Sequence, residues 1–181
     1  MIYVFLADGF EEIEALCPVD IMRRAGLSVV TVGISKKEIV GSHGITVLAD
    51  ITDAELSFDE DIDLIFLPGG MPGTKNLDAS SSVHKMIDLA IEQNAYIAAI
   101  CAAPMILGKR GLLNGKEAVC YPGFEEYLTG SKIPTDKSIV FDGKIITAKG
   151  MGVATDFGLA LTALFCGKEK SDSLRHAIIA D

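Results

Sequence analysis

The sequence has little positive charge, no long uncharged run and no basic leader. Its 181 residues include 16 Lys and Arg against 25 Asp and Glu, which gives a formal charge of −9. A net negative charge is poorly suited to neutralising phosphates, which argues against a nucleic-acid partner. The longest nearly uncharged stretch, residues 95–108, contains a proline and is shorter than the roughly 20 residues that cross a membrane. No basic residue precedes the N-terminal apolar run, so this run does not resemble a signal peptide. A cytoplasmic protein with no membrane partner is therefore predicted.

The four cysteines form none of the usual paired motifs. They include no Cys-x-x-Cys pair and have no histidine three to five residues away, which argues against a metal site and a disulfide framework. The sequence has no Gly-Lys-Ser/Thr phosphate loop, so no cofactor is expected. Cys17 and Cys166 are predicted to pack as small hydrophobes. Cys120 is predicted to be buried, with a second redox thiol as the alternative.

Short apolar runs alternate with amphipathic stretches along the chain. Such uniformly apolar runs are typical of parallel strands that are covered on both faces. The runs are residues 2–7, 29–34, 64–67, 96–100 and 145–148. Helices are expected over about 13–26, 81–91 and 155–167, and a turn at 41–44 followed by a strand at 45–48 suggests a hairpin arm. This order predicts one α/β domain over residues 1–181, a doubly wound sandwich with a mostly parallel sheet and helices on both faces.

Two strand exits carry acids and glycines. After the first run, Glu11 and Glu12 are expected to be first-turn acids that complement the helix dipole. Glu14 lies deeper beside the apolar stripe, so burial and a raised pKa are expected. After the third run, Gly69 and Gly70 allow unusual backbone angles that turn N–H groups into a crevice, as in an oxyanion site. A tight strand-to-helix turn is the alternative for these glycines.

The third exit places a cysteine at the end of a buried strand. Cys101 follows residues 96–100, and Ala102 and Ala103 permit a sharp turn like the nucleophile elbow of α/β hydrolases. A helix is expected to begin at once, so its N-terminal N–H groups would lower the thiol pKa. The alternative is an inert buried cysteine.

Six short motifs occur in a fixed order along nearly the whole chain. They are Gly9–Glu14, Pro18–Gly26, Leu67–Gly70, Asn76–Leu77, Ala98–Pro104 and Lys149–Gly152. In these elements the sequence resembles the ThiJ/PfpI superfamily, in the branch that contains the parkinsonism-associated protein deglycase.

The resemblance implies a flavodoxin-like sandwich, similar to class I glutamine amidotransferases, which commonly forms a homodimer. It also implies that Cys101 is the nucleophile, that Glu14 hydrogen-bonds its sulfur, and that N–H groups of Gly70 and Ala102 face the site. A protonated Glu14 would donate this hydrogen bond, lowering the thiol pKa and raising its own.

The sequence departs from the family pattern at two positions. Ala102 follows the cysteine where the peptidase-like branch has a histidine, which disfavours proteolysis. Tyr121 stands before Pro122 where the deglycase has a histidine, and the three histidines of this chain are expected to be exposed. Residues 117–120 are predicted to form a strand that brings Tyr121 and Pro122 to the pocket of the cysteine. Gly69 is also expected to line this pocket.

Two functions are compatible with these residues. The first is a cysteine-dependent stress-response activity of glyoxalase or deglycase type on small reactive aldehydes such as methylglyoxal, or on their glycated protein adducts, in which Cys101 attacks the carbonyl. The second is a non-enzymatic oxidative-stress sensor or redox-regulated chaperone, in which Cys101 is oxidised to sulfinic acid.

Overall fold

A computed structural model describes residues 1–180 and contains a sheet of seven strands in the order β5-β2-β1-β6-β7-β9-β8. Neighbouring strands are parallel except for the β8–β9 pair at one edge. The strands are β1 (Ile2–Leu6), β2 (Val29–Gly33), β5 (Ile51–Thr52), β6 (Leu64–Leu67), β7 (Tyr96–Ile100), β8 (Ile139–Asp142) and β9 (Ile145–Ala148). All five predicted apolar runs are therefore confirmed as strands, and the predicted hairpin is an antiparallel pair of β3 (Glu38–Val40) and β4 (Thr46–Leu48).

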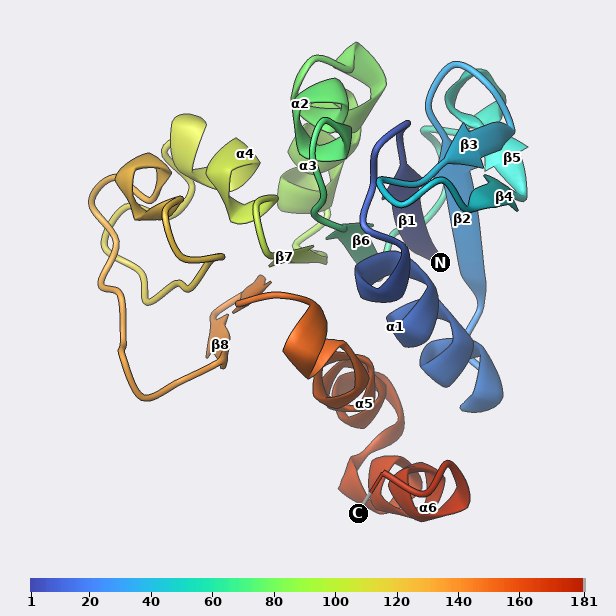
Figure 1. The fold of residues 1–181 in the computed structure, drawn as a ribbon, viewed down its shortest axis with the longest axis vertical. Helices are drawn as coiled ribbons and strands as arrows, with labels where there is room; N and C mark the ends of the chain where they lie inside the picture. Colours follow the sequence, from blue (N-terminus) through green and yellow to red (C-terminus); the bar gives the residue numbers. More distant parts are fainter. Residues whose placement is uncertain (181) are drawn as a thin grey trace.

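Helices cover both faces of the sheet. They are α1 (Glu12–Arg24), α2 (Gly73–Asp78), α3 (Ser81–Glu92), α4 (Pro104–Lys109), α5 (Ala154–Cys166) and α6 (Lys168–Ala177). In Figure 1, α2, α3 and α4 lie on one side of the sheet and α1 and α5 on the other, while α6 lies beyond α5. The α/β sandwich expected from the sequence is confirmed. Within residues 1–180 no helix is both long and apolar enough to span a membrane.

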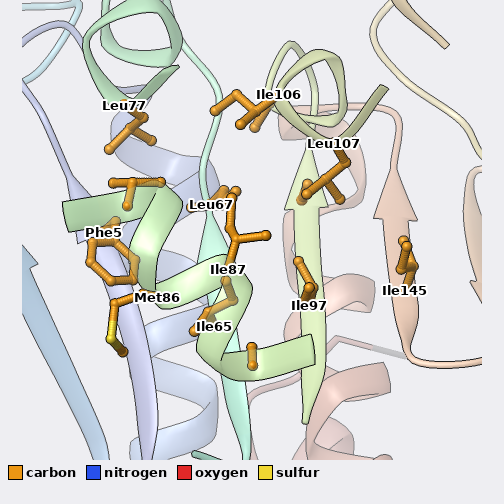
Figure 2. Close-up of a cluster of buried hydrophobic side chains, with 14 of the residues drawn as sticks. Phe5, Ile65, Leu67, Leu77, Met86, Ile87, Ile97, Ile106, Leu107 and Ile145 are labelled. Carbon is orange, nitrogen blue, oxygen red and sulfur yellow. The ribbon is translucent and has the colours of Figure 1, made fainter. Parts of the chain in front are cut away.

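The central strands are apolar throughout because each face packs against helices. On β6, Ile65 and Leu67 point towards Ile87 of α3 (Figure 2). Phe66 points to the opposite face, where its ring meets that of Phe157 on α5 edge to face at 5.5 Å between centroids. Alternation of side chains along a strand requires apolar residues at every position when both faces are buried.

One predicted strand is wrong. Within residues 117–120, Glu117 alone forms an isolated bridge, with Lys132. The backbone N–H of Glu117 donates to the Asp142 carboxylate at 2.8 Å, and that of Val119 donates to the Thr147 hydroxyl at 3.0 Å. Side chains of β8 and β9 therefore take the donors that a strand neighbour would use.

Candidate functional site

Cys101 lies in a strained turn at the carboxyl end of β7. Its φ is +64°, an uncommon value for a residue with a side chain. Its backbone N–H donates to the Ala148 carbonyl at 2.9 Å, and its own carbonyl accepts from Tyr121 N–H at 2.8 Å. Helix α4 begins three residues later, at Pro104, and has six residues. The prediction that a helix begins directly at the cysteine is wrong, although the sharp turn is present.

Glu14 points from the first turn of α1 into the site and is 1% exposed. One carboxylate oxygen, Oε2, accepts from the N–H of Gly69 at 3.1 Å. The carboxyl group also hydrogen-bonds with the Cys101 side chain and the Met151 backbone. Burial raises the pKa of Glu14 to about 7, because the charged form loses its hydration, and these hydrogen bonds limit the rise. The predicted burial and raised pKa are confirmed.

The thiol of Cys101 behaves differently from the expectation. Burial, and then the negative charge and hydrogen bond of Glu14, raise the pKa of Cys101 to about 12. The prediction of a lowered thiol pKa is therefore wrong for the state in which Glu14 is ionised. Backbone N–H groups of Ala102 and Gly70 act in the opposite direction and lower the pKa. A thiolate at Cys101 thus requires Glu14 to hold the proton, because two adjacent negative charges are unfavourable.

Two glycines allow the backbone to approach the pair. A Cβ added at Gly69 would lie 2.5 Å from Oε2 of Glu14 and 2.6 Å from Cβ of Cys101. Gly70 has φ +91°, which a side chain would strain, and a Cβ there would lie 2.3 Å from the Glu11 nitrogen. The backbone N–H groups of Gly70 and Ala102 both hydrogen-bond with the sulfur of Cys101. The structure therefore places Gly69, Gly70 and Ala102 beside Cys101.

Tyr121 and Gly150 form another wall of the site. A Cβ added at Gly150 would lie 3.4 Å from the Tyr121 ring, 3.6 Å from Oε1 of Glu14 and 4.0 Å from the Cys101 sulfur. Tyr121 is 51% exposed, so this wall of the site reaches the protein surface. Sequence reasoning misses the role of Gly150, because backbone proximity to a sulfur leaves no signal in residue type.

Cys120 and Pro122, which flank Tyr121 in the sequence, face away from the site of Cys101. Pro122 lines a cavity of about 230 Å³ with Cys120 and Lys149, and neither Cys101 nor Glu14 lines it. Cys120 is buried as predicted. It belongs to the core cluster on the α3 side of the sheet, whereas Cys101 packs against the cluster on the α1 side. Burial raises the pKa of Cys120 to about 11.

The remaining cysteines and histidines lie outside this group. Cys17 is half-buried with its sulfur 3.4 Å from the Thr155 hydroxyl, and Cys166 is also half-buried. His84 is half-buried, not exposed as expected, and its Nε2 lies 2.7 Å from the Asp78 carbonyl. No disulfide links any of the four cysteines in the described chain.

Glu12 is an acid of the first turn of α1, as predicted, and it is buried, whereas Glu11 caps α1 by accepting from the Glu14 N–H. Oε1 of Glu12 accepts from the backbone N–H of His43 at 2.8 Å, and Oε2 lies 3.0 Å from His43 Nδ1. Burial alone would raise the pKa of Glu12, but hydrogen bonds from His43 and nearby backbone N–H groups lower it to about 2. Glu12 therefore anchors the β3–β4 hairpin to α1.

Glu11, Glu12 and His43 also bring possible metal-ligand atoms within 4.8 Å of one another. Both oxygens of Glu12 already accept hydrogen bonds from the hairpin, so attachment of the hairpin explains the cluster.

Comparisons with known proteins show the family and the fold. The model of the DJ-1/PfpI family matches residues 1–164. The chain is 35% identical over 178 residues to Protein dj-1beta of Drosophila melanogaster, covering 97% of this chain and 95% of that protein. The crystal structure of Drosophila DJ-1beta superposes with a TM-score of 0.93 at 33% identity, covering 98% of this chain and 96% of that one.

Two further relatives bear on the chemistry of the site. The chain is 28% identical to a Caenorhabditis elegans protein named glutathione-independent glyoxalase DJR-1.2, over 91% of this chain and 87% of that protein. It is 32% identical to oxidized Toxoplasma gondii DJ-1, whose structure superposes with a TM-score of 0.91 over 98% of this chain and 97% of that chain. From the family match over residues 1–164 and this likeness along nearly the whole chain, we conclude that the protein belongs to the DJ-1/PfpI family.

Proposed function

We propose that the protein is a cysteine-dependent stress-response protein that acts through Cys101 on reactive aldehydes such as methylglyoxal, or on the protein adducts that they form. The observation that supports this most is the convergence of a thiol, a buried carboxyl group of raised pKa and two backbone N–H groups. A nucleophile, a proton carrier and an oxyanion site are the three parts that addition to a carbonyl requires. The glyoxalase name of the Caenorhabditis elegans relative agrees with this chemistry.

In the proposed reaction the sulfur of Cys101 attacks the aldehyde carbon. The S–C bond forms, the carbonyl electron pair moves to oxygen, and the thiol proton passes to the Glu14 carboxylate. N–H groups of Gly70 and Ala102 donate to the oxyanion until Glu14 returns the proton, which completes a hemithioacetal. The raised pKa of the thiol fits this order. The thiol keeps its proton until the sulfur attacks, so attack and proton transfer to Glu14 occur together.

Methylglyoxal has a second carbonyl next to the aldehyde carbon. Glu14 removes the hydrogen of the first carbon as a proton, and the electron pair forms a double bond to the second carbon while the second carbonyl pair moves to its oxygen. Glu14 then returns its proton to the second carbon, and the hydroxyl proton of the first carbon passes to the second oxygen as a carbonyl forms at the first carbon. The product is a lactate thioester on Cys101, which one water molecule hydrolyses to lactate and free thiol. The overall reaction consumes one water molecule and needs no oxidant or reductant.

The test is lactate production from methylglyoxal by the purified protein. Cys101→Ser should abolish it, and Glu14→Gln should lower it by about 100-fold or more, as expected for loss of a general base. Cys166→Ser is the matched control, because that half-buried sulfur lies at the end of α5, and it should retain activity. Equal lactate production by wild type and Cys101→Ser would reject the proposal.

A second candidate function is a redox sensor, supported by the same N–H groups. A sulfinate at Cys101 would accept from Gly70 and Ala102 and from a protonated Glu14, so the site suits an oxidised sulfur as well as an oxyanion. The Toxoplasma gondii relative is known in an oxidised form, which agrees with this chemistry. Addition of two oxygens to Cys101 by mild peroxide, without lactate production, would favour the sensor.

We also propose a cytoplasmic homodimer. The support is an apolar surface near the start of α1, where Ile13 is 48% exposed and Ile45, held to Glu12 through its backbone, is 55% exposed. Ile13→Glu should shift the mass in solution from two copies to one, as measured by light scattering. If the wild type and Ile13→Glu both have the mass of one copy, the dimer is rejected.

A further inference from the structure

A second polar crevice lies at the carboxyl edge of the sheet, away from Cys101. It has a volume of about 450 Å³, which is within the range of small-molecule sites. Loops that follow β1, β2 and β5 form one wall, and the α2–α3 junction forms the other. Its polar lining includes Asp8, Ser35, Lys36, Asp53, Asn76 and Ser81. The chain adds β2 and β5 on one side of β1 and then crosses to β6 on the other side, so the crevice lies near the change of direction where doubly wound sheets bind ligands.

Side-chain hydrogen bonds hold the walls of the crevice together. The Lys36 ammonium lies 2.8 Å from the Asp8 carboxylate, which joins the loops after β1 and β2. The Asn76 side-chain amide donates to the Asp8 carbonyl at 2.7 Å, which joins α2 to the same loop. The Asp53 carboxylate accepts from the Ser35 N–H at 2.9 Å. The polar groups are therefore positioned before any ligand arrives.

Several hydrogen-bonding groups remain for a ligand. Asn76 uses its amide nitrogen on Asp8, which leaves its carbonyl oxygen as an acceptor. The Lys36 ammonium has three donors and one carboxylate partner. Within residues 1–180 the Ser81 hydroxyl has no hydrogen-bond partner. The lining thus offers both donors and acceptors, and Ala7 and Ile34 add apolar surface to it.

The charges of the lining narrow the ligand class. Two carboxylates, on Asp8 and Asp53, repel a free phosphate, and the Lys36 ammonium repels a cation. Hydroxyl groups both donate and accept, so a molecule with several of them matches a mixed lining, and its C–H groups can contact Ala7 and Ile34. We infer that this crevice binds a neutral polyhydroxylated small molecule, a sugar or polyol. The inference does not depend on aldehyde chemistry at Cys101.

The test is an NMR titration of the full-length protein with D-ribose, D-glucose and glycerol, and with inorganic phosphate as the anionic arm. We expect saturable shifts of the Ser35, Asn76 and Ser81 amide signals with at least one of the sugars or glycerol, with dissociation constants in the millimolar range of about 1–20 mM. Asn76→Ala should weaken this binding about fivefold, the value of one hydrogen bond. Ser81→Ala, at the exposed first position of α3, is the second variant and should also weaken it.

Lys75→Ala is the matched control, because it lies beside Asn76 on α2, is exposed and does not line the crevice. It should bind as the wild type does. The inference is overturned if no compound shifts these signals at about 100 mM, or if phosphate alone does. It is also overturned if both Asn76→Ala and Ser81→Ala bind as tightly as the wild type. Methylglyoxal turnover by the same variants reports separately on Cys101.

Discussion

Two glutamates in the first turn of α1 should respond to pH in opposite directions. Glu12 and Glu14 are both buried, yet the pKa of Glu12 is lowered to about 2 and that of Glu14 is raised to about 7, from a common ordinary value of 4.5. The hydrogen-bond donors of the hairpin outweigh burial for Glu12, whereas burial outweighs its hydrogen bonds for Glu14. A Glu→Gln substitution at each position separates the two pH responses, because it removes the titrating group and nearly keeps the shape of the side chain.

For Glu14 the folded state binds the proton more tightly than the unfolded state does. Its contribution to stability is therefore complete below pH 4.5 and is lost as the pH rises to about 7. At about 1.4 kcal/mol per pKa unit, the rise corresponds to about 3 kcal/mol. Relative to the wild type, Glu14→Gln should thus gain about 3 kcal/mol in free energy of unfolding between pH 4 and pH 8.

For Glu12 the sign is reversed. A lowered pKa means that its contribution is complete above pH 4.5 and is lost as the pH falls towards 2. Glu12→Gln should therefore be less stable than the wild type at pH 7, and the difference should shrink in acid. Urea unfolding followed by circular dichroism from pH 3 to pH 8 measures both variants, and Glu92→Gln, on the exposed end of α3, controls for loss of a charge. Parallel pH curves for Glu14→Gln and the wild type would refute the reasoning.

Three further predictions concern the cysteine site. Glu14→Gln should move the inflection of Cys101 alkylation to lower pH, because it removes the charge that raises the thiol pKa; an inflection at higher pH would contradict this, as measured by iodoacetamide kinetics. Mild peroxide should oxidise Cys101 before the buried Cys120, and peptide mapping that finds Cys120 oxidised first would count against an accessible site. Tyr121→Phe should leave Cys101 oxidation unchanged and reduce lactate production modestly, whereas Tyr121→His should raise it by adding a group that titrates near neutrality; equal lactate production by both variants would exclude a proton-transfer role.

The strands were predictable because burial on both faces leaves a strong pattern. Each run from β1 to β9 that lies in the middle of the sheet is apolar at nearly every position. Edge strand β8 was missed, because it alternates exposed and buried residues over four positions. Residues 117–120 are as apolar as an edge strand, but the N–H groups of Glu117 and Val119 donate to side chains on β8 and β9. A local pattern carries no information about such long-range partners.

The proximity of Cys101, Glu14 and Gly70 also followed from sequence, since all three come after or near the carboxyl ends of parallel strands that meet at one edge. The charge state of the site did not follow. The expected low thiol pKa assumed a helix that begins at the cysteine and a protonated Glu14, whereas the structure starts that helix at Pro104, and burial and the charge of Glu14 raise the thiol pKa. The burial of Glu12 did not follow either, because its hydrogen-bond donors come from a hairpin about 30 residues further along the chain.

The pair of Cys101 and Glu14 is best understood as one group that holds a mobile proton. A Glu14 pKa of about 7 means that the carboxyl group is protonated in a large fraction of molecules at neutral pH, so both an acid and a base are at hand. When Glu14 is ionised, the thiol keeps its proton, and attack on a carbonyl must deliver that proton to Glu14. When Glu14 is protonated, the Gly70 and Ala102 N–H groups favour the thiolate. In the proposed reaction the carboxyl group on α1 therefore controls the reactivity of Cys101 and serves as the proton carrier.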